Sequence, residues 1–182
     1  MKIMAVWGKV LLKNEPDWLL HLRERNNNFY EYHVTLKQPC WIDESQLPKI
    51  EQQLSDCLAK FKVLDHSIEL NFNKLEVDET DGIILLFARN QQLIASLQKE
   101  IVSCLANYGN YVSPESEEYE ANFRPHLTLA FDLSPDEVKS VSNLIPNNPV
   151  LNGRITQLVL SAVKEINPKE ATNPSNFIIY SL

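Results

Sequence analysis

Positive charge is scarce in this chain of 182 residues. Its 17 lysines and arginines are outnumbered by 24 aspartates and glutamates, which gives a formal net charge of −7 at pH 7. A protein that follows the backbone of a long nucleic acid needs a basic face. The composition therefore argues against an extended phosphate-binding groove, while a small nucleotide or the end of a short oligonucleotide remains compatible with it.

Cysteine is also rare, and so are long apolar runs. The three cysteines, Cys40, Cys57 and Cys104, are odd in number and lack the spacing of a metal site, which is typical of reduced residues in a cytoplasmic protein. The apolar run near the N-terminus is shorter than the core of a signal peptide and is accompanied by Lys9 and Lys13. We therefore expect a cytoplasmic protein without membrane association, and the sequence indicates no obligate protein partner.

A linker or low-complexity stretch is missing too, so residues 1–182 are expected to form a single domain. Apolar patterns predict strands at residues 2–12, 30–38, 62–77, 82–89, 124–131, 152–164 and 177–181. Helical spacing predicts helices at residues 43–60 and 90–107 and a short helix that opens at Ser134. Pro39 is expected to end the second strand, and the acidic segment 109–123 is expected to be a solvated loop. This order describes two similar α+β halves, which suggests two lobes around a cleft.

The most informative feature of the sequence is a four-residue motif that occurs twice. HVTL at residues 33–36 and HLTL at residues 126–129 share the pattern His-x-Thr-Leu, although the chain contains only four histidines. Successive side chains of a strand point to opposite faces, so the His and Thr of each copy share one face while the apolar residues point into a core. Each copy lies on a strand of a different half, and we expect the two to meet at one site.

Two histidines can divide acid and base work near neutral pH, because the unperturbed pKa of imidazole lies close to neutrality. In-line displacement at phosphorus puts the attacking and leaving oxygens on opposite sides, which suits one imidazole on each wall of a cleft. His33 and His126 are therefore the candidate catalytic pair. The hydroxyls of Thr35 and Thr128 are candidates for binding the non-bridging phosphate oxygens. This chemistry needs no metal and no other cofactor, and the similar motifs leave open which histidine is the acid.

Residues beside the motifs extend the candidate site. By strand alternation, Lys37 would lie on the face of the first motif's His and Thr, and Arg124 on the corresponding face of the second. Either charge would then offset that of a phosphate. Tyr111, in the segment before the second motif, is a further candidate for substrate binding. Phe131 falls on the opposite face and is expected to lie in the core.

The paired sequences HVTL and RPHLTLAF, in a chain of this length, resemble the motifs of the two-histidine (2H) phosphoesterase superfamily. Within it, the chain is most similar to the 2′-5′ RNA ligase and cyclic phosphodiesterase-like proteins. The resemblance implies a bilobal α+β fold with two antiparallel β-sheets facing a central cleft, helices on the outside and pseudo-twofold symmetry. It also implies that His33 and His126 are catalytic and that Thr35 and Thr128 bind phosphate. Many members of the RNA-ligase-like branch have a basic residue where this chain has Phe131.

The resemblance further implies a metal-independent phosphodiesterase that acts on 2′,3′-cyclic phosphate ends of RNA or nucleotides, or on 2′-5′ linkages, with reverse ligation in some members. The expected partner is a nucleotide or short RNA that carries such a group. The alternative is a non-catalytic module that binds nucleotides or RNA ends on the same fold, against which the intact His and Thr of both motifs argue. Metal ligation by the histidines has little support, because two histidines with threonine neighbours make no usual zinc site.

Overall fold

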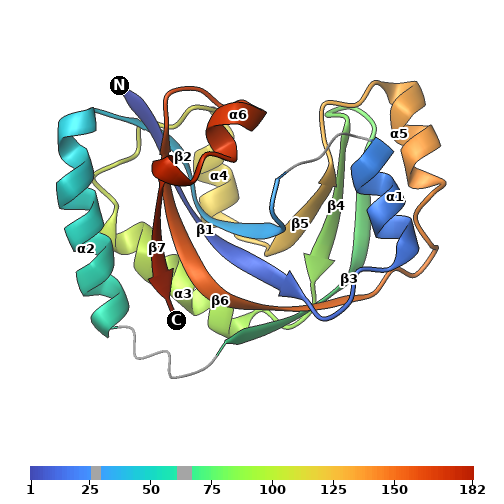
Figure 1. The fold of residues 1–182 in the computed structure, drawn as a ribbon, viewed down its shortest axis with the longest axis horizontal. Helices are drawn as coiled ribbons and strands as arrows, with labels where there is room; N and C mark the ends of the chain where they lie inside the picture. Colours follow the sequence, from blue (N-terminus) through green and yellow to red (C-terminus); the bar gives the residue numbers. More distant parts are fainter. Residues whose placement is uncertain (26–29, 61–66) are drawn as a thin grey trace.

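The computed structural model describes residues 1–25, 30–60 and 67–182, and these form an α+β fold (Figure 1). The strands are β1 (Lys2–Leu12), β2 (His33–Ile42), β3 (Ile68–Asp78), β4 (Ile83–Ala88), β5 (His126–Ala130), β6 (Leu151–Val163) and β7 (Phe177–Ser181). The helices are α1 (Asp17–Arg25), α2 (Leu47–Lys60), α3 (Gln92–Cys104), α4 (Ser116–Ala121), α5 (Pro135–Ser142) and α6 (Pro168–Ala171), with 3-10 turns η1 (Glu44–Gln46) and η2 (Pro174–Asn176). Within these described ranges, no helix is long and apolar enough to cross a membrane.

The strands form one antiparallel sheet in the order β2-β1-β6-β3-β4-β5, with β7 paired to β6. Strand β6 joins the two halves of the molecule. One of its edges pairs with β1, and the other pairs with β3 over residues 151–155 and with β7 over residues 157–161. The predicted α+β class with antiparallel strands is confirmed. Because both halves share β6, their strands form a continuous hydrogen-bonded network instead of two separate sheets.

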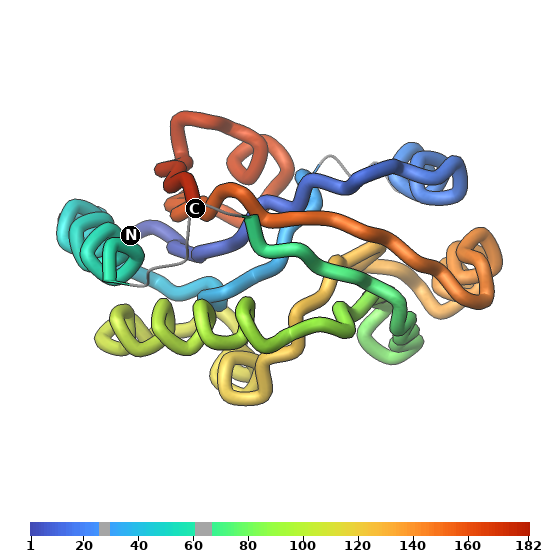
Figure 2. Tube along the Cα trace, turned by 90° about the horizontal axis from the view of Figure 1, so that it is seen from below, coloured from blue at the N-terminus to red at the C-terminus, as the bar shows by residue number. Residues whose placement is uncertain are grey.

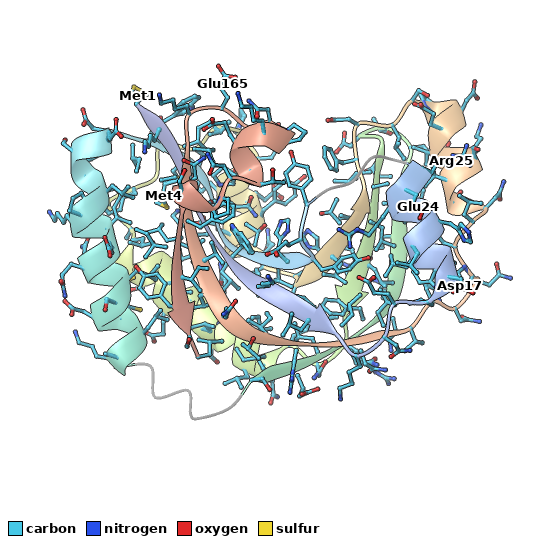
Figure 3. All side chains as sticks on the ribbon, viewed as in Figure 1. Met1, Met4, Asp17, Glu24, Arg25 and Glu165 are labelled. Carbon is cyan, nitrogen blue, oxygen red and sulfur yellow. The ribbon has the colours of Figure 1, made fainter. Side chains whose placement is uncertain are left out.

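The two motif strands, β2 and β5, stand at opposite ends of this strand order and nevertheless contact each other. Helices α3 and α4 pack against β2, and α1 and α5 pack against the half that contains β3, β4 and β5 (Figure 1). Figure 2 shows α6 on one face of the sheet and α3 and α4 on the other. In Figure 3, Asp17, Glu24 and Arg25 of α1 lie at the far side of the molecule from Met1 and Met4. The curvature of the sheet thus brings its first and last strands together.

One cluster of buried apolar side chains extends through both halves. Strand β1 contributes Met4 and Val6, α3 contributes Leu97, and α2 contributes Ile50 and Leu54. Both apolar positions of each motif also belong to this cluster, as strand alternation predicts. The motif strands are therefore anchored through one face, which leaves the face that carries His and Thr available for a site.

The predicted helices and strands agree with the structure apart from four differences. The sequence patterns predict neither α1 nor α6, and α4 lies within the segment 109–123 that was expected to be a loop. Strand β2 continues through Pro39 to Ile42, so the prediction that this proline ends the strand is wrong. Gln38 and Pro39 together lie opposite Ala5, in a bulge at which the missing amide of proline costs no ladder bond. Residues 62–66 of the predicted third strand lie outside the described residues.

Candidate active site

His33 and His126 have the same backbone anchor. Nδ1 of His33 lies 2.8 Å from the carbonyl oxygen of Glu31, and Nδ1 of His126 lies 2.8 Å from the carbonyl oxygen of Arg124. A carbonyl oxygen only accepts hydrogen bonds, so Nδ1 carries the hydrogen in both rings. Each neutral imidazole therefore presents Nε2 as the nitrogen that can take up a proton. In both motifs, the acceptor is the backbone carbonyl of the residue two positions before the histidine.

An aromatic ring supports each histidine from the neighbouring strand. The ring of Trp7 on β1 lies 5.4 Å from that of His33, at an interplanar angle of 56°. The ring of Phe87 on β4 lies 5.2 Å from that of His126, at 57°. Sequence reasoning missed both aromatic residues. Phe87 lies in a predicted strand, but only the register of the sheet shows that it is opposite His126.

The two motifs meet across the contact between β2 and β5. A hollow of about 40 Å³ is lined by residues of both strands, of the segment before β2 and of the position after β5: Tyr30, Glu31, Tyr32, His33, Leu127, Thr128 and Phe131. Thr128 shares the face of His126, two positions away on β5. Thr35 lines a larger groove of about 520 Å³ together with His33. The structure thus brings the two His-Thr pairs into one region.

The surroundings favour the neutral form of both histidines. Burial lowers the pKa of His33 below its ordinary value of 6.5, against the opposing effect of the bond to the Glu31 carbonyl. Burial also lowers the pKa of His126, and a positive charge on His33 lowers it further. The effect of His33 on the pKa of His126 follows from the proximity of the two rings.

Each motif strand has a bulge directly after its threonine. On β2, Thr35 lies opposite Trp7 while Lys37 lies opposite the next residue, Val6, so Leu36 is an extra residue. On β5, Thr128 lies opposite Leu85 while Ala130 lies opposite Ile84. The extra residue reverses the alternation beyond each threonine. Simple alternation therefore predicts the wrong side of the sheet for the side chains that follow each motif.

The bulge on β2 changes the side of the sheet on which Lys37 lies. The prediction that Lys37 shares the face of His33 and Thr35 is wrong, because the bulge turns it to the side of the sheet covered by α3 and α4. Its Nζ lies 2.9 and 3.0 Å from the two carboxylate oxygens of Glu120, and both side chains are buried. Tyr111 belongs to the same network, since its hydroxyl donates to Glu120 at 2.8 Å and lies 3.2 Å from Lys37 Nζ. The structure does not bring Lys37 or Tyr111 to the His-Thr pairs.

Glu120 also corrects the expectation for the acidic segment. It lies on α4, is 7% exposed, and accepts the backbone N–H of Gln38 at 2.7 Å in addition to its bonds with Lys37 and Tyr111. The prediction that the carboxylates of residues 109–123 are all solvated is therefore wrong at this position. A helical turn that begins at Ser116 places this one carboxylate inward against β2.

The bulge on β5 changes the position of Phe131 in the same way. Phe131 was expected in the core, but it is 40% exposed, lines the hollow, and lies 5.8 Å from the ring of Tyr30. The bulge after Thr128 turns Ala130 into the core and Phe131 toward the hollow. An apolar ring thus occupies the rim of the site at this position.

An ion pair lies beside each histidine, on the face of the sheet that carries the His and Thr side chains. Arg124 makes two bonds to the carboxylate of Glu76, at 2.5 and 3.1 Å, and its guanidinium lies 3.8 Å from the centre of the Phe87 ring. Hydrogen bonds from Arg124 and Lys74 lower the pKa of Glu76 to about 2. On the other side, Lys9 Nζ lies 2.6 Å from Glu31. Arg124 therefore lies beside the second motif, with its charge already paired.

Among the described residues, no three His, Cys, Asp or Glu side chains are grouped as a set of metal ligands. The groups that the site offers are two neutral imidazoles and two hydroxyls. Such a set can accept and donate protons and can hydrogen-bond to oxyanions.

Comparison with known proteins shows the family to which this chain belongs. A family model described as the 2′-5′ RNA ligase superfamily matches residues 20–165. No curated protein matches the chain. Among solved structures, the crystal structure of a phosphoesterase has 12% identity and a TM-score of 0.54, covering 100% of this chain and 96% of that one.

Two further solved structures have similar scores. Escherichia coli LigT complexed with 3′-AMP has 14% identity and a TM-score of 0.53, covering 100% of this chain and 95% of that one. Kluyveromyces marxianus Usb1 with uridine monophosphate has 13% identity and a TM-score of 0.52, covering 99% and 98%. At these identities the structures show the fold alone, whereas the family model matches most of the sequence. The chain belongs to the 2′-5′ RNA ligase superfamily of two-histidine phosphoesterase enzymes.

Proposed function

We propose that this protein is a metal-independent phosphodiesterase in which His33 and His126 are the acid–base pair and Thr35 and Thr128 bind the phosphate. The observation that carries the proposal is the identical anchoring of both Nδ1 atoms, which leaves Nε2 of each ring available for proton transfer. Its substrates are 2′,3′-cyclic phosphate ends of RNA or nucleotides, or 2′-5′ phosphodiester linkages.

The reaction needs one neutral and one protonated imidazole. The neutral ring takes the proton of the attacking water as the oxygen approaches phosphorus, and the protonated ring gives its proton to the leaving ester oxygen. The threonine hydroxyls donate to the non-bridging oxygens, where negative charge develops. Both rings have lowered pKa values in the free site, and the negative charge of a bound phosphodiester raises the pKa of the nearer imidazole. Substrate binding thereby supplies the protonated partner.

The family supports the class of substrate. Superfamily membership favours a phosphodiester of RNA or of a nucleotide, and the related folds include proteins solved with 3′-AMP and with uridine monophosphate. The net charge of −7 favours a nucleotide or a short RNA end over a long RNA. Reverse 2′-5′ ligation would use the same two proton transfers in the opposite direction.

The test is a substrate panel in the presence of EDTA. Purified protein is assayed with 2′,3′-cyclic mononucleotides, a short RNA with a 2′,3′-cyclic end, and 2′-5′ oligoadenylate, and the products are identified as 2′-phosphates, 3′-phosphates or released nucleotides. We expect turnover of at least one substrate, a loss of about 10²–10⁴-fold in His33→Ala and in His126→Ala, and a smaller loss in Thr128→Val.

The exposed His21 on α1 provides a matched control, and His21→Ala should retain full activity. Absence of turnover on the whole panel, or full activity in either motif variant, would contradict the proposal. Tight binding of a cyclic-phosphate end without turnover would instead favour the non-catalytic binding module.

A further inference from the structure

A large groove opens directly beside His33 and Thr35. Its volume is about 520 Å³, and its lining includes residues of β1, β2, β6, β7 and α6. It therefore lies on the face of the sheet where Figure 2 shows α6. Most of its lining is apolar: Ile3, Ala5, Trp7, Pro39, Val163, Ile166, Ala171, Pro174, Phe177 and Ile179. The rings of Trp7 and Phe177 meet edge to face at 5.7 Å, at an angle of 90°. We call this space the apolar groove.

The hydroxyls of Thr172 and Ser161, which also line the apolar groove, already donate hydrogen bonds within the protein. Thr172 donates to the carbonyl oxygen of Pro168 at 2.7 Å, and Ser161 donates to that of Ala5 at 3.3 Å. A ligand inside the groove could therefore accept a hydrogen bond from these hydroxyl groups only after an existing bond is broken. Recognition there depends mainly on buried apolar area and on aromatic contact.

The apolar groove also offers no unpaired positive charge among the described residues that line it. Lys9 is the one cation in the lining, and its Nζ is held by Glu31 at 2.6 Å. A second phosphate in the groove would lie without a counterion next to apolar walls, which is unfavourable. The groove thus suits one uncharged group attached to a phosphate that lies at its mouth.

We propose that the apolar groove binds the organic group that is esterified to the phosphate of the substrate, and that this group is uncharged and apolar or aromatic. The groove would recognise it by contact area and not by hydrogen bonds or a second phosphate. This inference rests on the proposed function for the placement of the phosphate at His33 and Thr35. The substrate would then be a small phosphodiester with a single phosphate group, and the groove would distinguish little between one aromatic base and another. Extension of the chain by further charged nucleotides into the groove would not strengthen binding.

Calorimetric binding of a ladder of monoesters tests this without requiring turnover. The ligands are inorganic phosphate, methyl phosphate, phenyl phosphate and 1-naphthyl phosphate, with the uncharged 1-naphthol as a probe of the groove alone. We expect affinity to rise about tenfold from methyl to phenyl phosphate and further to naphthyl phosphate, as apolar area is buried. Adenosine 3′,5′-bisphosphate should bind no more tightly than adenosine 3′-monophosphate.

Ile179→Asp places a carboxylate in the groove without touching His33 or Thr35. It should reduce the affinity for naphthyl phosphate to about that for methyl phosphate and leave inorganic phosphate unchanged. Val150 provides the matched control, because it is 55% exposed, close to the 57% of Ile179, and does not line the groove. Val150→Asp should bind the whole ladder as the unmodified protein does, and thermal unfolding should show both variants folded.

The outcomes separate the two proposals. If phosphate binds but added apolar area gives no gain, or if Ile179→Asp and Val150→Asp behave alike, the inference about the apolar groove is overturned. If no phosphate ester binds while naphthol still does and is lost in Ile179→Asp, the groove exists as an apolar site and the proposed phosphate site fails.

Discussion

Lys37 Nζ lies 2.9 Å from Glu120 Oε1, and the two side chains are 1% and 4% exposed. Burial alone would lower the pKa of Lys37, but the hydrogen bond and charge of Glu120 outweigh it and raise that pKa. Glu120 also accepts the N–H of Gln38, which lies in the irregular part of β2 just past the motif. The buried ion pair therefore stabilises the strand geometry that follows Thr35.

Removing the carboxylate would leave Lys37 buried without a counterion. We expect Glu120→Gln to lower the free energy of unfolding by about 3–5 kcal/mol, the range for breaking a buried pair. The double variant Lys37→Met/Glu120→Gln should recover much of that loss, because no charge is left buried. Denaturant unfolding followed by circular dichroism measures both. Glu69→Gln, which breaks the exposed pair with Lys13 at 3.0 Å, serves as control and should have no measurable effect; an equally small effect of Glu120→Gln would refute this prediction.

The buried aromatic ring of Phe87 lies against the ring of His126. Replacing it with leucine keeps an apolar side chain but opens space beside the imidazole, so the pKa of His126 should rise toward 6.5 and kcat should fall about tenfold through looser positioning. An NMR titration of the His126 ring protons measures the pKa.

Phe72 provides the comparison for this variant, because it is a fully buried phenylalanine on β3. Phe72→Leu should destabilise the protein to a similar degree without moving the pKa of His126. A common shift in both variants would show that the effect comes from general loosening and not from the ring contact.

The pH dependence follows from the lowered pKa values of both histidines. The base must be neutral, so kcat/KM rises as pH increases through its pKa; the acid must be protonated, so kcat/KM falls as pH increases through the other pKa. Since kcat/KM reports the free enzyme, its maximum should lie below pH 6.5. The maximum of kcat should lie at higher pH, because the bound phosphate anion raises the pKa of the acid. Steady-state rates from pH 4.5 to 8.5 measure both profiles, and a kcat/KM maximum above pH 7.5 would be inconsistent with neutral, buried imidazoles.

The pair of Arg124 and Glu76 predicts a small dependence of stability on acid. The folded pKa of Glu76, about 2, is below its ordinary value of 4.5, so its contribution is complete above pH 4.5 and is lost as pH falls toward 2. The side chains are 46% and 37% exposed, and after screening the contribution is less than about 1 kcal/mol. Urea unfolding at pH 6 and at pH 3 should show Glu76→Gln losing less stability on acidification than the unmodified protein. Equal losses would mean that the pair contributes nothing in solution.

The sequence predicted the motif strands and their facing because a strand has a strict two-residue period. His33, Thr35, His126 and Thr128 lie as that period requires, and the apolar motif positions are buried. Beyond the threonines the period fails, since a bulge adds one residue and depends on how the neighbouring strand pairs. The register of β1 with β2 is a property of the folded sheet and has no signal in the motif itself.

The partners of the site were beyond prediction for the same reason. Trp7, Phe87 and Glu120 come from segments distant in sequence, and their roles depend on contacts across the sheet. In the acidic segment, the four glutamates from Glu115 to Glu120 carry no sign in the sequence that distinguishes a solvated carboxylate from a buried one. Only the buried Lys37 on β2 selects Glu120 as its counterion.

The central claim is that His33 and His126 act together on one reaction, and a double-mutant comparison tests it most directly. The value of kcat is measured for His33→Ala, His126→Ala and the double variant, with the substrate of the panel that turns over fastest. If the two rings form one acid–base pair, each single variant should lose nearly as much rate as the double variant, because loss of one partner already disables the pair. Single losses that multiply to give the loss of the double variant, or a single variant that retains its rate, would contradict the claim.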